Sequence, residues 1–416
     1  MPEPLLDISE QKGDGGMIPR DTYLRFLLHS KDKQIIKVIS GVRRCGKSTL
    51  LEIYREHLLA KGVEPRQIIF INFEDISYEN LQHYRSLYDY ITTKLLPEKM
   101  NYIFLDEIQH VADFEKAVDS LFIKKNTDIY ITGSNAYFMS GELATLLSGR
   151  YIELKMLPLS FREYCLGTDQ AIPIPRKYVQ YTEHGSFPYT LQYNGKTQAI
   201  RDYLDSLYNT VLIKDIVSRY RISDVMMLQS VTKFVFDSIG SQLSVSRIAN
   251  TMTSAGRKID SKTVEKYIRA LTGSMMIYQA NRYNIKGKQH LKTLEKYFVV
   301  DIGLRYMLLG KRHTDIGHIL ENVVYLELLR RGYSVYVGQI GDAEVDFVAM
   351  NGDGTTYLQV AASVRDNTTL RRELSSLQKI SDHYPKLLLT LDDDPTADYD
   401  GIRRINGLDW LLGETK

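Results

Sequence analysis

The chain has 416 residues and a net charge of +2, and its 44% hydrophobic and 25% charged residues are typical of a globular protein. Because this length exceeds what one hydrophobic core usually serves, we expect two or three domains. No run of apolar residues approaches the roughly 18 that a membrane helix needs, so we expect none. Two cysteines exclude a disulfide framework or a zinc quartet, and without a signal pattern at the N-terminus we expect a cytoplasmic protein.

The strongest motif is a glycine-rich loop between a predicted strand, residues 34–40, and a predicted helix, residues 49–59. The loop reads G-x-x-x-x-G-K-S, which is the pattern of a phosphate-binding P-loop. Its backbone N–H groups and the helix N-terminus are suited to phosphate. The residues that we expect to contact a nucleoside triphosphate are Gly41, Arg43, Arg44, Cys45, Gly46, Lys47, Ser48 and Thr49.

Two residues of this loop have specific expected roles, and three others remain open. Lys47 is expected to reach the β- and γ-phosphates, and Ser48 to place its hydroxyl on Mg²⁺. Arg43 and Arg44 either add positive charge or form salt bridges to neighbouring loops, and the sequence does not choose between these roles. Cys45 fits a small filler better than a redox sensor.

Three more patterns typical of buried strands follow, over residues 67–73, 101–108 and 128–132, and helical patterns separate them. This alternation predicts βαβ units and a parallel sheet with helices on both faces. Ligands of such a sheet bind at the carboxyl ends of its strands. The polar residues that follow these strands are therefore the candidates for a functional site.

The strand at residues 101–108 ends in two carboxylates, Asp106 and Glu107, about sixty residues after the P-loop. Asp106 is expected to hold Mg²⁺ directly or through water, and Glu107 to polarise the attacking water. Phosphoryl transfer depends mostly on positioning and charge neutralisation, and these two roles supply both. The pattern is weak by itself and becomes strong after a sound P-loop.

Polar residues after the next strand provide candidates for a third contribution. Ser134 or Asn135 is expected to hydrogen-bond the γ-phosphate or the water as a sensor, and the alternative is a turn that uses these residues for local hydrogen bonds. Arg150 completes the site within its own chain, acts as an arginine finger across a subunit interface, or is structural. The sequence leaves these alternatives open, and the oligomeric state with them.

Together these motifs resemble a family of prokaryotic AAA-like P-loop ATPases. The resemblance covers nearly the whole chain and rests on GVRRCGKS, FLDEI, ITGSN, LSGR, LPLSFREY and GSFP. The P-loop and the Asp-Glu strand are generic to the superfamily, whereas PLSFREY and GSFP are specific to the family. The resemblance implies ATP as the nucleotide, hydrolysis with Mg²⁺ and a C-terminal domain of uncharacterised function. Many members have a second glycine where this chain has Ser186.

The sequence predicts four consecutive units in an α/β protein. They are a parallel-sheet P-loop ATPase core at 1–165, a helical lid or connector at 166–236, a winged helix-like unit at 237–308 and a C-terminal unit at 309–416. The connector is helical throughout and carries no catalytic constellation.

Residues 244–290, which we call the basic module, have the outline of a winged helix-turn-helix. Two capped helices at 244–252 and 260–271 precede a strand pair with a basic turn at 286–288. The module carries nine Lys or Arg and two Asp or Glu, a net charge of +7 that leaves −5 for the rest of the chain. Such a concentration fits contact with the backbone of double-stranded DNA, and the alternative is a packing or protein-contact unit.

The C-terminal unit is predicted to have a helix at 319–329 and a three-stranded meander over 333–364. With Glu321 and Asp346 at one edge, it resembles the PD-(D/E)xK core of α/β restriction-endonuclease-like domains, which binds Mg²⁺ through such acids. The third position reads Gln359-Val360-Ala361, so an amide replaces a carboxylate and alanine replaces lysine. We therefore expect a catalytically inactive domain that binds nucleic acid or a protein partner. A live nuclease is the less favoured alternative.

Two hypotheses follow for the whole chain. In the first, ATP binding and hydrolysis reposition the basic module and the nuclease-like domain, with DNA as a candidate partner. In the second, the chain is a nucleotide-gated DNA-binding or protein-interaction regulator whose hydrolysis is incidental.

Overall fold

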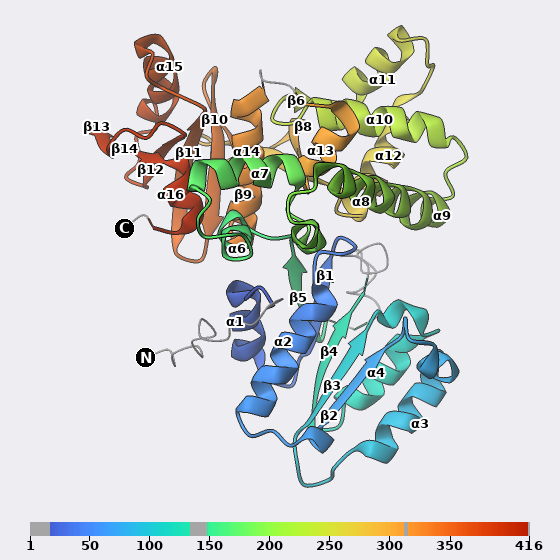
Figure 1. Ribbon diagram of the computed structural model, residues 1–416. Coiled ribbons are helices and arrows are strands. Elements are labelled where there is room, and N and C mark those ends of the chain that lie inside the picture. Colours follow the sequence, from blue (N-terminus) through green and yellow to red (C-terminus); the bar gives the residue numbers. More distant parts are fainter. Residues whose placement is uncertain (1–16, 134–146, 148, 312–314, 415–416) are drawn as a thin grey trace.

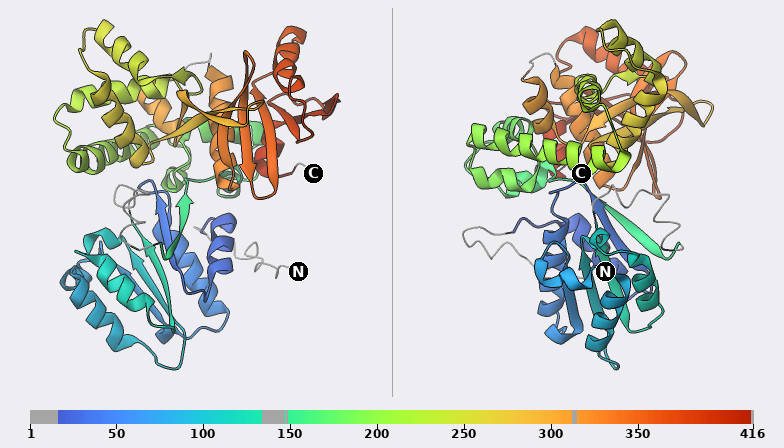
Figure 2. Two further views of the ribbon diagram at one scale, coloured as in Figure 1. Left: turned by 180° about the vertical axis from the view of Figure 1, so that it is seen from behind. Right: turned by 90° about the vertical axis from the view of Figure 1, so that its right-hand side faces the viewer.

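The computed structural model describes residues 17–133, 147, 149–311 and 315–414 (Figure 1). The described residues up to Met156 form an N-terminal lobe, and those from Phe161 onward form a C-terminal lobe (Figures 1 and 2). The strands β1 and β5 run toward the C-terminal lobe, so the loop after β1 lies where the lobes meet. Over the same residues, no helix is long and apolar enough to cross a bilayer.

The N-terminal lobe is built on five parallel strands in the order β2-β3-β4-β1-β5. Their bounds are β1 Ile36–Gly41, β2 Ile68–Asn72, β3 Asn101–Asp106, β4 Thr127–Thr132 and β5 Tyr151–Met156. The three central strands are buried along their whole length, which explains their continuous apolar sequences. The predicted parallel sheet is confirmed, and β5 is an edge strand that the sequence patterns did not reveal.

Helices cover both faces of this sheet, as predicted. They are α1 Asp21–Ser30, α2 Lys47–Ala60, α3 Tyr84–Lys94 and α4 Phe114–Phe122, with short 3₁₀ turns at η2 Pro65–Gln67, η3 Ile76–Leu81 and η4 Ile108–His110. Successive side chains of a strand point to opposite faces. Ile39 of β1 therefore packs in the core with α1 and α2, whereas its neighbour Val38 packs in the core with α3 and α4.

The C-terminal lobe begins with a run of helices that passes over the loop after β1 (Figure 1). They are α6 Phe161–Leu166, α7 Ile174–His184, η5 Pro188–Tyr193, α8 Thr197–Asn209, η6 Thr210–Val217, α9 Ser218–Tyr220 and α10 Val225–Asp237. The elements α8, η6 and α9 follow one another without a break, and η6 is a π-helix. Residues 197–220 thus form one long helix within the connector, which we call the connector helix, and its middle is wound differently from its ends.

A nine-stranded sheet in the order β13-β14-β12-β11-β10-β9-β7-β8-β6 forms the rest of the C-terminal lobe. Its strands are β6 Gln242–Leu243, β7 Ile277–Asn284, β8 Gln289–Val299, β9 Ser334–Ile340, β10 Ala343–Asn351, β11 Gly354–Ala361, β12 Lys386–Thr390, β13 Ala397–Tyr399 and β14 Ile402–Asn406. The helices are α11 Val245–Ser254, α12 Ser261–Gly273, α13 Ile302–Leu309, α14 Ile316–Arg330, α15 Asn367–Gln378 and α16 Gly407–Leu412. Because β7 pairs with β9 in parallel, one sheet runs across the unit boundary that we expected at residues 308–309.

The GSFP segment packs against the start of α13 through backbone contact. The carboxylate of Asp301 accepts hydrogen bonds from the Leu304 N–H at 2.7 Å and from the Ser186 hydroxyl at 2.7 Å. Burial raises the pKa of this carboxyl group. A Cβ added to Gly303 would come within 2.4 Å of the nitrogen of Gly185, so the contact requires glycine.

Replacing Gly303 by alanine should lower the free energy of unfolding by about 1–3 kcal/mol, because the new methyl group would overpack a backbone contact. The matched control is Gly317→Ala in α14, where an added Cβ meets no atom within 4 Å. The control should be neutral or stabilising by up to about 1 kcal/mol, since alanine favours helix over glycine. Urea unfolding midpoints measure both variants, and equal midpoints would contradict the proposed close contact.

Candidate functional site

The loop between β1 and α2 has a backbone that its two glycines make possible. Gly46 has φ of 103°, in the left-handed region that glycine adopts most readily. Gly41 has no such angle, but a Cβ at this position would lie 2.5 Å from the carbonyl oxygen of Met156 in β5. One glycine is therefore needed for its conformation and the other for close approach, and the loop ends directly at the N-terminus of α2.

Lys47 lies across the base of this loop. It is the first residue of α2 and only 5% of it is exposed. Its Nζ lies 3.4 Å from the Gly41 carbonyl oxygen and 3.7 Å from Oε1 of Glu107. The ammonium group thus joins the P-loop to the acidic pair at the end of β3.

The other loop residues differ in their surroundings. Arg43 forms an ion pair with Asp215 of η6, which is one of the two roles that the sequence left open. Arg44 and Thr49 are exposed. Cys45 is fully buried, and burial raises the pKa of its thiol, which agrees with a filler rather than a reactive thiolate.

The order of the strands places β4 between β1 and β3, so Thr132 at the end of β4 lies beside the acidic pair. Its hydroxyl donates a hydrogen bond to Oδ1 of Asp106 and accepts one at 3.0 Å from the N–H of Glu107. Thr132 therefore anchors both carboxylate residues. Sequence reasoning missed it, although it is the last residue of the predicted strand.

Asp106 has one carboxylate oxygen free for a cation. The side chain is fully buried, and burial raises its pKa, while the hydroxyl groups of Thr132 and Ser48 lower it. Its Oδ2 accepts no hydrogen bond of ordinary geometry from any described residue. Buried polar atoms normally have partners, and a carboxylate with a hydroxyl is a donor set that suits Mg²⁺.

A cation at this place would need ligands from outside the chain. Within the described ranges, no group of three or more His, Cys, Asp or Glu residues could hold a metal ion. Mg²⁺ is commonly bound through one or two carboxylates together with substrate phosphates and water. The residues present therefore fit a Mg²⁺ ion that arrives with a nucleotide.

Glu107 follows Asp106 and has a left-handed backbone, with φ of 55°. Its side chain is 12% exposed, and Oε2 accepts a hydrogen bond from Nε2 of Gln109. Gln109 and Lys47 therefore hold the carboxylate from two sides.

The remaining predicted residues are not brought to the site by the described structure. Ser134 and Asn135 lie outside the described residues. Arg150 precedes β5, and its carbonyl oxygen accepts the N–H of Ile36 at the start of β1. The P-loop follows the carboxyl end of β1, whereas Arg150 lies at the amino end. For a strand of six residues the two places are about 20 Å apart. Its guanidinium packs over the ring of Phe122, 5.6 Å from the centroid.

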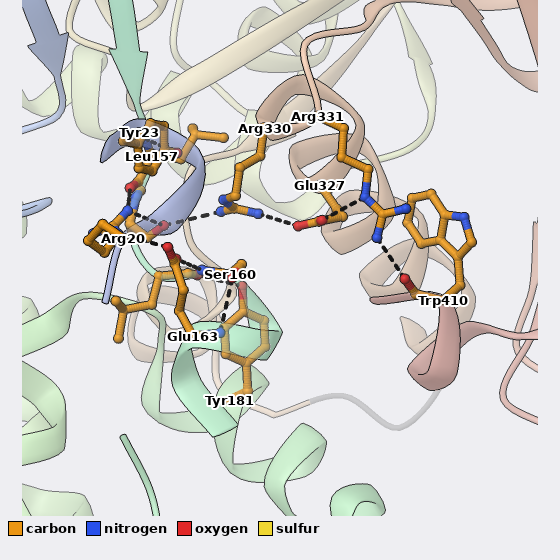
Figure 3. A network of polar contacts seen from close by, with 12 residues as sticks. Arg20, Tyr23, Leu157, Ser160, Glu163, Tyr181, Glu327, Arg330, Arg331 and Trp410 are labelled. Carbon is orange, nitrogen blue, oxygen red and sulfur yellow. Dashed lines mark hydrogen bonds and ion pairs between the residues drawn. The ribbon is translucent and has the colours of Figure 1, made fainter. Parts of the chain in front are cut away.

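A buried arginine outside the predicted site, Arg20, joins the P-loop to the segment after β5, and Figure 3 shows it beside Leu157 and Glu163. Arg20 is 3% exposed and donates to the carbonyl oxygens of Cys45 at 3.0 Å and Leu157 at 2.6 Å. Its Nε donates to Oε1 of Glu163 at 3.0 Å. Glu163 also forms a capping box with Ser160 at the start of α6. Residues 160–163, which read SFRE, therefore cap a helix and hold this arginine, and their S-x-x-E spacing is the sequence signature of such a cap.

The same network continues into the C-terminal lobe (Figure 3). Arg330 of α14 donates to the carbonyl oxygen of Pro158 at 3.1 Å and to Glu327 at 2.7 Å. Arg331 donates to Glu327 at 2.8 Å, and its guanidinium lies 3.9 Å from the ring centroid of Trp410 in α16. Consecutive polar contacts therefore connect the P-loop with α14 and α16.

Comparison with known proteins divides the chain near the place where the lobes meet. A family model described as an AAA domain matches residues 33–165, and one described as a domain of unknown function matches residues 175–315. An uncharacterised protein of Haemophilus influenzae is 40% identical over 400 residues, which cover 95% of this chain and 99% of that protein. An uncharacterised protein of Methanocaldococcus jannaschii is 27% identical over 395 residues, or 91% of this chain and 84% of that protein. Among solved structures, the Walker-type ATPase of Pyrococcus abyssi aligns with 70% of this chain and 96% of its own, at 15% identity and a TM-score of 0.49.

Replacing Thr132 by valine keeps the shape of the side chain and removes the hydroxyl that anchors Asp106 and Glu107. We expect kcat for nucleoside triphosphate hydrolysis to fall by about 10²-fold, because small displacements of catalytic groups have effects of this size. The dissociation constant of the nucleotide should change little. Thr132→Ser, which keeps the hydroxyl, is the control. Phosphate release and nucleotide titration measure the two quantities, and a normal kcat in Thr132→Val would refute the anchoring role.

Proposed function

We propose that this chain, which belongs to the same family as the uncharacterised Haemophilus influenzae protein and whose residues 33–165 match an AAA domain, is an ATPase that hydrolyses ATP with Mg²⁺. The observation that carries the proposal is the convergence of Lys47, Asp106 and Glu107 behind a P-loop. Lys47 Nζ lies 3.7 Å from Glu107, and Asp106 has a buried oxygen near Ser48 that receives no hydrogen bond of ordinary geometry from the described residues. These are the positioning and charge-neutralising groups that phosphoryl transfer requires.

Each group has a defined role in this mechanism. The backbone N–H groups of the P-loop and the N-terminus of α2 bind the phosphate oxygens of ATP. Lys47 neutralises charge on the β- and γ-phosphates, and Glu107 orients and polarises the attacking water with support from Gln109 and Thr132. Ser48 and Asp106 hold Mg²⁺, which supplies further charge neutralisation when bound. An arginine-finger role for Arg150 requires a second subunit, because within one chain this residue lies at the opposite end of the strands from the P-loop.

Glu107→Gln tests this assignment directly. The amide keeps the size of the side chain but cannot act as a base, so we expect kcat to fall by about 10²–10⁴-fold while ATP binding persists. Glu56→Gln, on the exposed face of α2, is the control and should retain full turnover. Phosphate release and equilibrium binding of labelled ATP separate the two effects. Full turnover in Glu107→Gln would remove Glu107 from the mechanism.

We further propose that the basic module is a winged helix that contacts double-stranded DNA. In support, α10, β6, α11, α12, β7 and β8 follow in the order of that fold, and β6 pairs with β8 beside the β7–β8 hairpin. The exposed residues Lys262, Lys266 and Arg269 lie on α12, the second helix of the helix-turn-helix. Lys286 and Lys288 are exposed at the hairpin turn. The alternative is a protein-contact role in a nucleotide-gated regulator.

For the C-terminal unit we propose an inactive nuclease-like domain that contacts a protein partner or nucleic acid. In support, α14 precedes the antiparallel strands β9, β10 and β11, and β12 after α15 is parallel to β11. Lys296 of β8 pairs with Glu321 at 2.8 Å and lies 3.6 Å from Asp346. Burial and the charge of Glu321 raise the pKa of Asp346. A lysine thus already neutralises the two acids that would hold a metal ion in an active relative.

The double variant Lys262→Ala/Lys266→Ala tests the DNA proposal. If each lysine neutralises one phosphate, the slope of log affinity against log salt should become shallower by about 1.8, since each contact contributes about 0.9. Lys61→Ala/Lys125→Ala, at exposed positions of the N-terminal lobe, is the charge-matched control. Fluorescence anisotropy of a labelled duplex at several salt concentrations gives the slopes. An unchanged slope, or no binding by the wild type, would favour the protein-contact alternative.

A further inference from the structure

An ion pair between Arg43 and Asp215 joins the P-loop to the connector helix. Nε of Arg43 donates to Oδ2 of Asp215 at 3.1 Å, and a terminal nitrogen donates to Oδ1 at 3.3 Å. The two side chains are 19% and 12% exposed. A two-point contact of this kind is a strong form of ion pair, and it fixes the direction of the guanidinium.

Arg43 lies close to the acidic groups of the site. Burial lowers its pKa, but the hydrogen bonds and charge of Asp215, together with the charges of Glu107 and Glu74, raise the pKa above its ordinary value. One nitrogen of Arg43 lies 3.7 Å from Oε1 of Glu74, which follows β2. The guanidinium is therefore within the electrostatic reach of Glu107, the residue beside Lys47.

Asp215 belongs to an unusual segment of the connector. The π-helix η6 spans eight residues, Thr210–Val217, between the α-helical segments α8 and α9. π-Helical turns are rare, are usually single bulges and often occur at functional sites. An α-helical register is the common alternative for the same residues, and in that register Asp215 would face in another direction. Arg43 thus contacts a residue whose direction depends on the π winding of this segment.

We propose that the phosphates of a bound nucleotide and Asp215 compete for Arg43, so that η6 senses occupancy of the P-loop. This inference rests on the proposed function of the loop. Phosphate oxygens accept the same two-point contact from a guanidinium as a carboxylate does, and a triphosphate carries more negative charge. The side-chain hydrogen bonds that the structure describes for Asp215 both go to Arg43. Nucleotide binding therefore removes the contact that holds η6 in its π winding.

The packing of the connector gives this change a route to the rest of the C-terminal lobe. The helix α8, continuous with η6, packs against α13, and α13 packs against α10 and α14. In turn α10 packs against α11 and α12 of the basic module. A change in the winding of η6 would therefore reach both the basic module and the C-terminal unit through direct contacts, as in other two-state switches.

Hydrogen–deuterium exchange of peptides that cover residues 210–217 tests the proposal, with the Mg²⁺ complex of the non-hydrolysable analogue AMPPNP as the probe. In the wild type, AMPPNP should raise exchange in these peptides, because loss of the Arg43–Asp215 contact lets the hydrogen bonds of η6 open more often. Asp215→Asn should exchange fast without nucleotide, show no further rise, and bind AMPPNP at least fivefold more tightly, because the competitor is gone. Arg43→Gln should also exchange fast but bind more weakly. Asp205→Asn, on the exposed face of α8, should behave as the wild type.

The possible failures are distinguishable, because AMPPNP binding is titrated in the same samples. Binding without a change in exchange at residues 210–217 would overturn the switch and leave the proposed ATPase intact. Equal affinities of Asp215→Asn and the wild type would also overturn it. Absence of AMPPNP binding by the wild type would overturn the proposed function and this inference together.

Discussion

The buried guanidinium of Arg20 is the contact on which the geometry of the P-loop depends. It joins the carbonyl oxygen of Cys45 to that of Leu157 and to the carboxylate of Glu163, which come from three separate segments. A buried charge is tolerated only when its hydrogen bonds are satisfied, and loss of Arg20 would leave Glu163 buried without its partner. The residues that hold the backbone of the P-loop therefore come from both lobes, since Arg20 precedes α1 and Glu163 belongs to α6.

The arginines on the two flanks of the P-loop differ in burial and in the number of groups that they contact. On one flank Arg20 is 3% exposed and bonded to several fixed groups. On the other, the side chain of Arg43 is 19% exposed and relies on the single carboxylate of Asp215 for its two hydrogen bonds. A phosphate can replace a carboxylate at a partly exposed arginine much more easily than it can displace backbone carbonyls from a buried one. The backbone of the loop is thus fixed by Arg20, whereas the side chain of Arg43 is free to exchange Asp215 for a phosphate in the switch that we propose.

Local sequence patterns predicted the parts of the site that are local in the chain. The strand before Gly41, the loop itself and the acidic pair at the end of β3 follow from apolar runs and motif spacing. The contacts of Arg20 with Glu163 and of Arg43 with Asp215 span 143 and 172 residues, and no pattern in one sequence pairs such positions. The π winding of η6 likewise has no sequence signal. The position of Lys296 beside Asp346 could not be predicted either, because β8 lies far along the chain from the motif around Gln359.

Steady-state phosphate release from ATP, measured with Mg²⁺, with and without double-stranded DNA and at low and high salt, tests the central assignment most directly. If the P-loop site is a catalytic centre connected to the basic module, the wild type will release phosphate without a partner. DNA will then accelerate the release, and high salt will remove the acceleration because it screens the phosphate contacts. No phosphate release under any of these conditions would contradict the assignment of Lys47, Asp106 and Glu107 as a hydrolytic site.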